Sequence, residues 1–310
     1  MVTSFALLSL SIAIIEFMAG ILGDGIILAT SSLSCFRSKT TSPYDMIVIS
    51  LSSSRFILHS WNIFDLFINI LHEHSNDEEN IFVVSKTVYI FLNYSCLWFG
   101  AWLSVFYCIK VASFTQSYFI WMKQRIARLV PWMLLISWLC SFTATIPFAW
   151  DAHGERNNFT APSSMTNSSE TRTTKKDSLG LLLLPYNAGI GLPLILCIVS
   201  SVLLIRSLWL HTRQMQNNAS GFRDPSSEAH ISAIKSVCSF LIFYVTHVIC
   251  VLILFNGFSV LSIGESICVV VMAACPTGHT IVLIWSNPKF RELPTRIWHH
   301  INCHVRIASM

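Results

Sequence analysis

Ionisable residues lie inside several stretches of sequence that are mostly apolar, and three of them stand deep within their runs. Arg55 stands well inside the apolar run 46–71, Asp24 lies in the run 5–33, and His279 lies in the run 263–285. A charged side chain at the centre of a bilayer costs about 2.5–3.5 kcal/mol on insertion scales, so such residues face a helix bundle and pair there. We therefore expect Asp24 and Arg55, with His279 near them, to form a buried network. This network is either a static ion pair that holds the packing or a switch between two states.

An aromatic stripe follows along the chain. Trp98, Trp102 and Phe106 stand at positions i, i+4 and i+8, which places them on one face of an α-helix. Aromatic rings on an inward face can form the wall of a small-molecule site. From the residues alone, core packing or a position at the membrane interface explains the two tryptophans better than a ligand site does.

Three polar residues fall in the outer halves of other apolar runs. Asp65 lies outward of Arg55, His247 lies outward of Lys235, and Glu265 lies at the start of the run 263–285. A few polar groups among apolar walls are typical of a ligand site, so we expect these residues to contact a ligand. A solvated helix end explains the two carboxylates as well, and a core histidine explains His247.

Catalytic and metal-binding patterns are absent from the sequence. It contains no HExxH, GxSxG or GxxxxGKS spacing, and its ten cysteines include no CxxC pair. The run 263–285 contains no lysine, which excludes a retinal Schiff base. We therefore expect a protein that is not an enzyme and that has neither a metal site nor a bound retinal.

The elements that must position these residues are membrane spans. The chain has 310 residues, of which 53% are hydrophobic and only 12% are charged, with a mean hydropathy of +0.60; soluble domains average about 25% charged residues. Apolar runs long enough to cross a bilayer predict seven helices. They cover residues 5–33, 46–71, 81–109, 129–150, 179–210, 233–255 and 263–285. The predicted fold is an all-α membrane protein, a single seven-transmembrane helix bundle over residues 1–310 with a tail at 286–310.

The distribution of Lys and Arg predicts the orientation. With the amino terminus outside, the inner segments 35–42, 110–128, 206–235 and 286–310 hold 14 of the 20 basic residues, as the positive-inside rule requires. The carboxyl terminus is then cytoplasmic. The sequons Asn158-Phe-Thr and Asn167-Ser-Ser fall in the outer loop 151–178, where a glycan could be attached.

Several stretches of this sequence resemble one receptor family, the type 2 (bitter) taste receptors. FYCIKVASFTQSYFIWMKQRI at 106–126 is similar to the end of the family's third span, and LSSSRFILHSW at 51–61 to its second-span motif. HTRQMQNNASGFRDPSSEAHISAIK at 211–235 resembles the third inner loop, PTGHTIVLIWSNPKF at 276–290 the end of the seventh span, and LIRSL at 204–208 the LxxSL motif of the fifth. The DRY, CWxP and NPxxY motifs of rhodopsin-like receptors are absent.

The resemblance implies a G-protein-coupled receptor for bitter small organic compounds in the plasma membrane. It implies coupling to a gustducin-type heterotrimeric G protein, membrane lipid around the bundle, no cofactor and no nucleic-acid partner. It also favours a ligand role for Trp98 and a glycan on Asn158 or Asn167. The residues expected on the G-protein side are Lys110, Lys123, Arg125, Ser207, Leu208 and His211.

Three positions depart from the family's usual residues. Asp24 stands where the family usually has Asn, His247 where many members have Tyr, and Thr280 where Ser is common. These departures bear on activation and ligand range. A seven-helix transporter or channel remains the alternative function from a different class.

Overall fold

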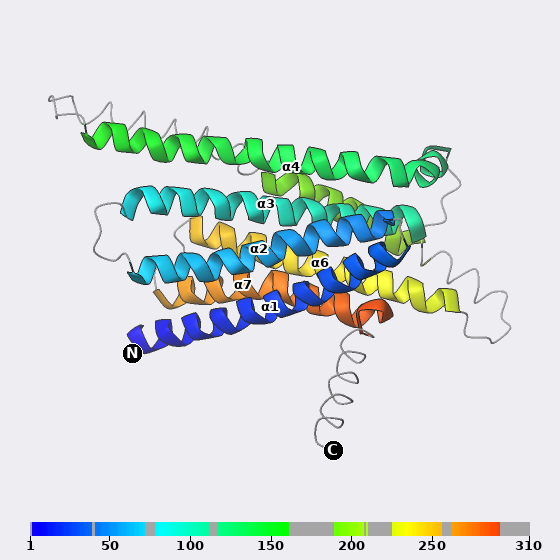
Figure 1. The fold of residues 1–310 in the computed structure, drawn as a ribbon, viewed down its shortest axis with the longest axis horizontal. Coiled ribbons are helices and arrows are strands. Elements are labelled where there is room, and N and C mark those ends of the chain that lie inside the picture. The colour runs from blue at the N-terminus through cyan, green and yellow to red at the C-terminus, as the bar shows by residue number, and fades with distance from the viewer. Residues whose placement is uncertain are drawn as a thin grey trace, which may run out of the picture.

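The computed structural model describes residues 2–38, 41–71, 78–111, 117–160, 189–207, 209, 225–255 and 262–291. Within these ranges the chain forms seven long helices (Figure 1). They are α1 (Val2–Ser38), α2 (Pro43–Leu71), α3 (Glu78–Val111), α4 (Ser117–Thr160), an unlabelled helix Gly189–Ser207, α6 (Pro225–Phe255) and α7 (Ser262–Ser286). A short turn of helix at 288–291 follows α7.

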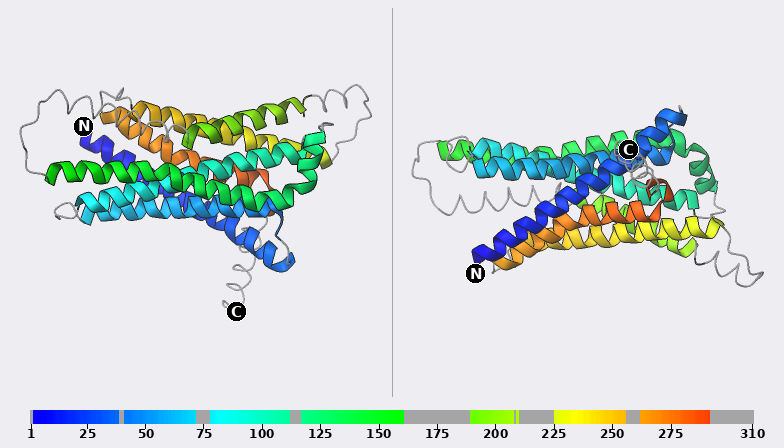
Figure 2. Two further views of the ribbon diagram at one scale, coloured as in Figure 1. Left: turned by 90° about the horizontal axis from the view of Figure 1, so that it is seen from above. Right: turned by 60° about the horizontal axis from the view of Figure 1, so that its bottom comes forward.

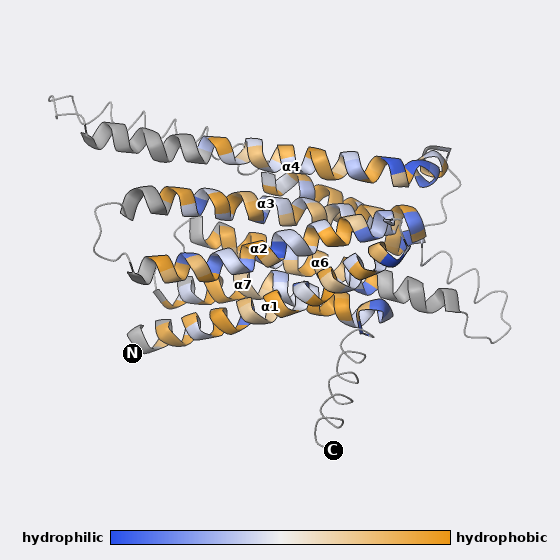
Figure 3. Cartoon of the chain, in the orientation of Figure 1, coloured by the Kyte–Doolittle hydropathy of each residue, from blue (hydrophilic) through white to orange (hydrophobic). Residues whose placement is uncertain are grey.

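The helices pack lengthwise into one bundle. Helix α1 contacts α2 and α7, α3 lies between α2 and α4 and also contacts α6, and α6 packs on α7. Figure 2 shows α1 tilted relative to α2, α3 and α4. Hydrophilic residues gather at the end of the bundle where α1 leads into α2 and where α4 begins (Figure 3). This is the end that the Lys and Arg distribution assigns to the cytoplasm.

Six of the seven described helices are long and apolar enough to cross a membrane, and α2 is the exception. Helix α2 has 29 residues, but Arg55, His59 and Asn62 lower its hydropathy. All three line a cavity inside the bundle. The polar residues that weaken the span signal therefore mark the inward face of α2.

The outer face of α4 is apolar. Trp132, Leu135, Leu139 and Phe142 are each more than half exposed, and their spacing places them along one side of the helix. A helix that presents such a side to the outside of a bundle needs lipid around it.

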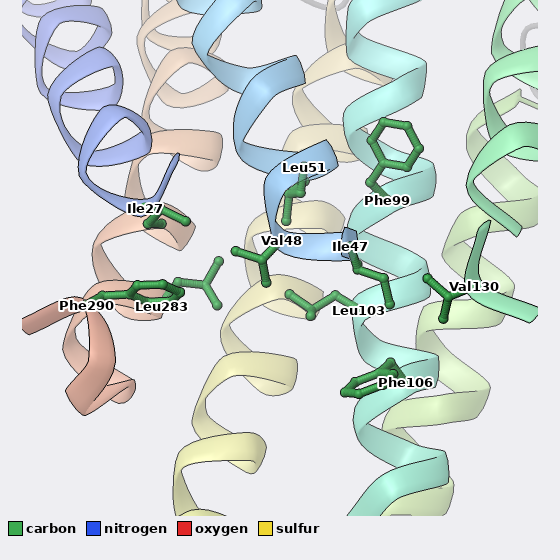
Figure 4. Close-up of a cluster of buried hydrophobic side chains, with 10 residues drawn as sticks. All are labelled: Ile27, Ile47, Val48, Leu51, Phe99, Leu103, Phe106, Val130, Leu283 and Phe290. Carbon is green, nitrogen blue, oxygen red and sulfur yellow. The ribbon is translucent and has the colours of Figure 1, made fainter. Parts of the chain in front are cut away.

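A buried apolar cluster packs the half of the bundle that leads to its hydrophilic end (Figure 4). Its members come from α1, α2, α3, α4, α7 and the turn after α7: Ile27, Ile47, Val48, Leu51, Phe99, Leu103, Phe106, Val130, Leu283 and Phe290. A second cluster joins α3, the 189–207 helix and α6 through Tyr94, Leu97, Ile190, Cys197, Phe240, Tyr244 and Val251.

Gly100 permits the close approach of α3 and α6. A Cβ atom at this position would overlap the ring of Phe240, so no larger residue fits without a shift of the ring. Small residues at helix contacts have this role in membrane bundles, where dispersion contacts drive helix association.

Ser42 caps the start of α2. Its hydroxyl oxygen accepts a hydrogen bond from the Asp45 backbone N–H at 3.1 Å, and the hydroxyl donates to the Asp45 carboxylate at 3.0 Å. Such a cap satisfies backbone donors that the first turn leaves unpaired. It also holds Asp45 in place at this end of the bundle.

Candidate ligand cavity and polar network

A cavity of about 300 Å³ lies between α2, α3, α6 and α7. Helix α2 contributes Arg55, Leu58, His59, Asn62 and Asp65, and α3 contributes Lys86, Tyr89, Asn93, Cys96 and Leu97. Both sets recur at helical spacing, so each is one continuous face of its helix. Aromatic rings of Phe240, Phe243 and Tyr244 on α6 and of Phe17 on α1 complete much of the apolar wall.

The inner end of this cavity is a polar network centred on Thr280. Arg55 Nη1 donates to Thr280 Oγ1 at 3.2 Å, and the Thr280 hydroxyl donates to Asp24 Oδ1 at 3.0 Å. Asp24 and Arg55 are 0% and 3% exposed. The sequence predicted that these two residues share a network, and the structure joins them through a hydroxyl from a third helix rather than by direct contact.

Two histidines flank this network. His59 Nε2 lies 3.9 Å from Asp24 Oδ2, and the His59 ring lies against Phe17 with centroids 5.8 Å apart. The His279 ring packs on Phe240 with centroids 5.1 Å apart. The structure thus places His279 beside Arg55 at the cavity floor, and it adds His59, which sequence reasoning missed. The position of His59, one helical turn after Arg55 on α2, could have identified this residue from the sequence.

Glycines let α1 approach this network. A Cβ at Gly20 would lie 2.5 Å from His59 Nε2 and 2.8 Å from Thr277 Oγ1. The Thr277 hydroxyl donates to the backbone carbonyl of Glu16 at 3.1 Å. Helices α1 and α7 are therefore close enough for Asp24 to reach Thr280.

The outer part of the cavity contains two of the predicted ligand residues. Asp65 accepts a hydrogen bond from the Ser85 hydroxyl, and His247 Nε2 lies 3.3 Å from Asn93 Nδ2. Both Asp65 and His247 line the cavity. Glu265 lies on α7, and its side chain is outside the part of the chain that the structure describes.

Trp98 and Trp102 lie on a different face of α3. Their rings stack with centroids 6.2 Å apart, and Trp102 Nε1 donates to the Ser137 hydroxyl of α4 at 2.5 Å. Neither tryptophan is among the residues that line this cavity. The structure therefore does not bring them together with Asp65 and His247, because the face of α3 that carries Asn93 and Leu97 is the one turned to the cavity.

Where the structure describes them, the residues expected on the G-protein side lie at the hydrophilic end of the bundle. Lys110 is exposed, with its ammonium 5.6 Å from the Phe106 ring centroid. Lys123 and Arg125 are exposed on the first turns of α4, and Ser207 ends the helix Gly189–Ser207. Leu208, His211 and Asn167 are outside the described residues, as is the side chain of Asn158 at the end of α4.

A second polar cluster at this end joins α2 to the turn after α7. Lys289 Nζ lies 2.6 Å from Asp45 Oδ1, and Asn287 Nδ2 donates to the Tyr44 hydroxyl at 3.0 Å. The Tyr107 hydroxyl of α3 lies 3.4 Å from the same Tyr44 oxygen. Sequence reasoning missed this cluster, since its members are far apart in the chain.

Comparison with known proteins identifies the family of this chain. The family described as "Taste receptor protein (TAS2R)" matches residues 1–302. "Taste receptor type 2 member 40" of Gallus gallus is 58% identical over 303 residues, which cover 97% of each chain. "Taste receptor type 2 member 39" of Homo sapiens is 34% identical over 301 residues, covering 97% of this chain and 88% of the relative. "Taste receptor type 2 member 119" of Mus musculus is also 34% identical, over 99% and 90% of the two chains. The chain therefore belongs to the type 2 (bitter) taste receptors, a family of multi-pass G-protein-coupled receptors and not of enzymes.

Proposed function

We propose that this receptor binds bitter-tasting small organic compounds in the cavity between α2, α3, α6 and α7. One observation carries the proposal: the cavity extends from Asp65 at its outer end to Arg55 and His279 at its floor. A ligand seated there would contact the buried polar network directly. The volume of about 300 Å³ is at the lower end of ordinary ligand sites, which span about 300–1,000 Å³.

Asp65 and His247 are the proposed polar ligand contacts in the outer part of the cavity. Both line it, and each has a partner that fixes its position, Ser85 for Asp65 and Asn93 for His247. Glu265 joins them in the proposal because it lies on the first turns of α7. Trp98 and Trp102 support the α3 wall from the α4 side, so their proposed effect on the ligand is indirect.

The proposed signalling path runs from the cavity floor to the cytoplasmic end. Asp24, Thr280 and Arg55 join α1, α7 and α2, so a ligand that shifts one of these helices disturbs all three. A gustducin-type heterotrimeric G protein would then contact the predicted inner surface of the receptor. This surface includes Lys110, Lys123, Arg125, Ser207, Leu208 and His211. This places the amino terminus outside the cell and residues 286–310 in the cytoplasm, in one receptor domain over residues 1–310.

The decisive experiment is an agonist screen in cells with and without a co-expressed gustducin-type G protein. A calcium response that requires both compound and G protein supports the proposal. A substrate flux or a current that needs no G protein would overturn it in favour of a transporter or channel.

A matched pair of variants then tests the cavity. His247→Ala should change the potency of two chemically unlike agonists by different factors, because the ring faces the ligand. Thr246→Ala, the adjacent residue on α6, should leave both potencies unchanged, since its hydroxyl bonds only to the Ile242 carbonyl of its own helix. If both variants changed the potencies of both agonists by the same factor, the cavity would not be the ligand site.

A further inference from the structure

We propose that the floor of the cavity is a subsite for a neutral hydrogen-bond acceptor of the ligand, such as a carbonyl or sulfonyl oxygen. Arg55, His59 and His279 form this subsite. The inference rests on the proposed role of the cavity as the ligand site, and it states which chemical group reaches the polar network.

The first support is a set of buried polar atoms that lack partners. Among the described residues, Arg55 Nε and both ring nitrogens of His59 and His279 make no hydrogen bond. The Ser236 backbone faces the His279 ring but does not reach hydrogen-bond geometry with it. The three residues are 3%, 0% and 1% exposed. Arg55 Nε always carries an N–H, and a neutral imidazole carries one on either of its ring nitrogens. Leaving such a buried donor without a partner is costly, so an acceptor that enters the cavity gains a hydrogen bond from Arg55 Nε or from the N–H of a histidine ring.

The second support is the arrangement of these groups around one space. Arg55 and His59 stand one turn apart on α2, and side chains at this spacing lie on the same face of a helix. His279 lines the same cavity from α7. Thr280, the residue after His279, accepts from Arg55 Nη1. This contact fixes the guanidinium while Nε stays without a partner.

The shape of the cavity suits a ligand with an apolar body and one acceptor. From Arg55 to Asp65 the cavity face of α2 rises by about 15 Å at 1.5 Å per residue. Tyr89, Leu97 and Phe243 line the same cavity. An acceptor at one end of a ligand can therefore reach Arg55 while aromatic surface packs above it.

The charge of the floor favours a neutral acceptor over a carboxylate. The Asp24 carboxylate already balances the Arg55 guanidinium, and Thr280 bridges the two. A second carboxylate would add an uncompensated negative charge in a buried site, which is far more costly than a dipole.

The test uses benzophenone and 1,1-diphenylethene as probes on the purified full-length receptor. The two compounds have nearly the same shape, and only benzophenone has an acceptor oxygen. The measurement is the ratio of their dissociation constants in each variant, so that partition into detergent cancels between variants. We expect the preference for benzophenone over 1,1-diphenylethene, measured as the ratio of dissociation constants, to be about three- to tenfold larger in wild type than in the variants that lack the donors. This factor corresponds to the free energy of one net hydrogen bond.

Two variants remove the donors and one keeps them. Arg55→Met combined with Asp24→Asn removes the donor without leaving an unpaired charge, and His279→Phe keeps a ring but removes both nitrogens. Each should abolish at least half of the wild-type preference on a logarithmic scale. Asp24→Asn alone keeps Arg55 and should retain the preference, as should Thr246→Ala, which changes a residue that does not line the cavity. His279→Phe supplies the same test by itself where the double variant does not fold.

Near-ultraviolet irradiation gives a second readout, because the excited carbonyl of benzophenone bonds covalently to the C–H groups that it touches. We expect adducts on the α2 and α7 peptides next to Arg55 and His279. An unchanged affinity ratio across all variants, or adducts confined to the outer cavity near Lys86, would overturn the subsite. Binding is measured without a G protein. A receptor that signals but shows no preference therefore refutes only the subsite, and one that shows the preference but never signals refutes only the proposed function.

Discussion

The hydroxyl of Thr280 on α7 donates a hydrogen bond to the Asp24 carboxylate on α1, with the two oxygens 3.0 Å apart. The same hydroxyl oxygen accepts from Arg55 on α2 at 3.2 Å. One small side chain therefore connects three helices and separates two buried charges. Removing it disturbs both charges at once.

Thr280→Val should destabilise the receptor, because it keeps the shape of the side chain and removes the shared hydroxyl. Leaving buried polar groups without a partner costs about 1–3 kcal/mol. We expect a lower midpoint of thermal unfolding for the purified receptor. Thr280→Ser keeps the hydroxyl and should remain near wild type.

Thr143→Val is the matched control for this prediction. Thr143 is exposed on α4, and its hydroxyl bonds only to carbonyls of its own helix. Its replacement should leave the midpoint unchanged. Equal midpoints for Thr280→Val and Thr143→Val would show that the bridging hydroxyl contributes nothing to stability.

Arg55→Ala should abolish signalling, whereas Asp24→Asn should be far milder. Removing one side of a buried ionic pair leaves the other charge uncompensated, at a cost of about 3–5 kcal/mol. The side-chain amide that Asp24→Asn introduces would still accept from Thr280, so that variant keeps the connection. Surface labelling and agonist-evoked calcium responses measure both effects. Wild-type expression together with a wild-type response for Arg55→Ala would contradict the role of the network.

Trp98→Ala should lower surface expression and scale down the responses to all agonists alike. Trp98 is 8% exposed and stacks on Trp102 outside the lining of the cavity, and deleting a buried tryptophan costs about 3–5 kcal/mol. The measurement compares surface labelling with the potency of two unlike agonists. Normal expression with a potency change for only one agonist would instead indicate direct contact between Trp98 and that ligand.

Asp45 and Lys289 should be coupled energetically. Their charged atoms lie 2.6 Å apart, and both side chains are partly shielded from solvent. A double-mutant cycle with Asp45→Asn and Lys289→Met should give a coupling of about 0.3–1 kcal/mol that weakens at high salt. The control cycle replaces Lys289→Met by Lys110→Met, because Lys110 contacts the Phe106 ring. This control cycle should give no coupling energy between Lys110 and Asp45.

Asn158, Asn167 or both should carry an Asn-linked glycan, because both sequons fall in the segment 151–178 that the Lys and Arg distribution assigns to the outside. Treatment of the expressed receptor with a glycosidase should increase its mobility on a gel. The double Asn→Gln variant should already run at the faster position and should not respond to the enzyme. An untreated wild type that co-migrates with the double variant would refute this prediction and remove one support for the orientation.

The sequence by itself determined the class of protein, because apolar runs of membrane length leave the backbone no alternative to helices in a bilayer. It also predicted that Asp24, Arg55 and His279 lie near one another inside the bundle, since ionisable groups at similar depth in a membrane face each other rather than lipid. The stretches 51–61, 106–126 and 276–290 were specific enough for the family. The protein class, the depth of the ionisable residues and the family motifs all depend on composition and on which residues are neighbours in the sequence.

Only the tertiary structure decided how each helix is rotated and which atoms meet. The rotation of α3 depends on contacts between helices, such as the fit of Phe240 against Gly100, and it turns Asn93 to the cavity and Trp102 to Ser137. The spacing of residues places them on one face but does not say which neighbour that face meets. For the same reason the sequence could not show that Thr280 stands between Asp24 and Arg55, because that contact depends on how closely α1, α2 and α7 pack.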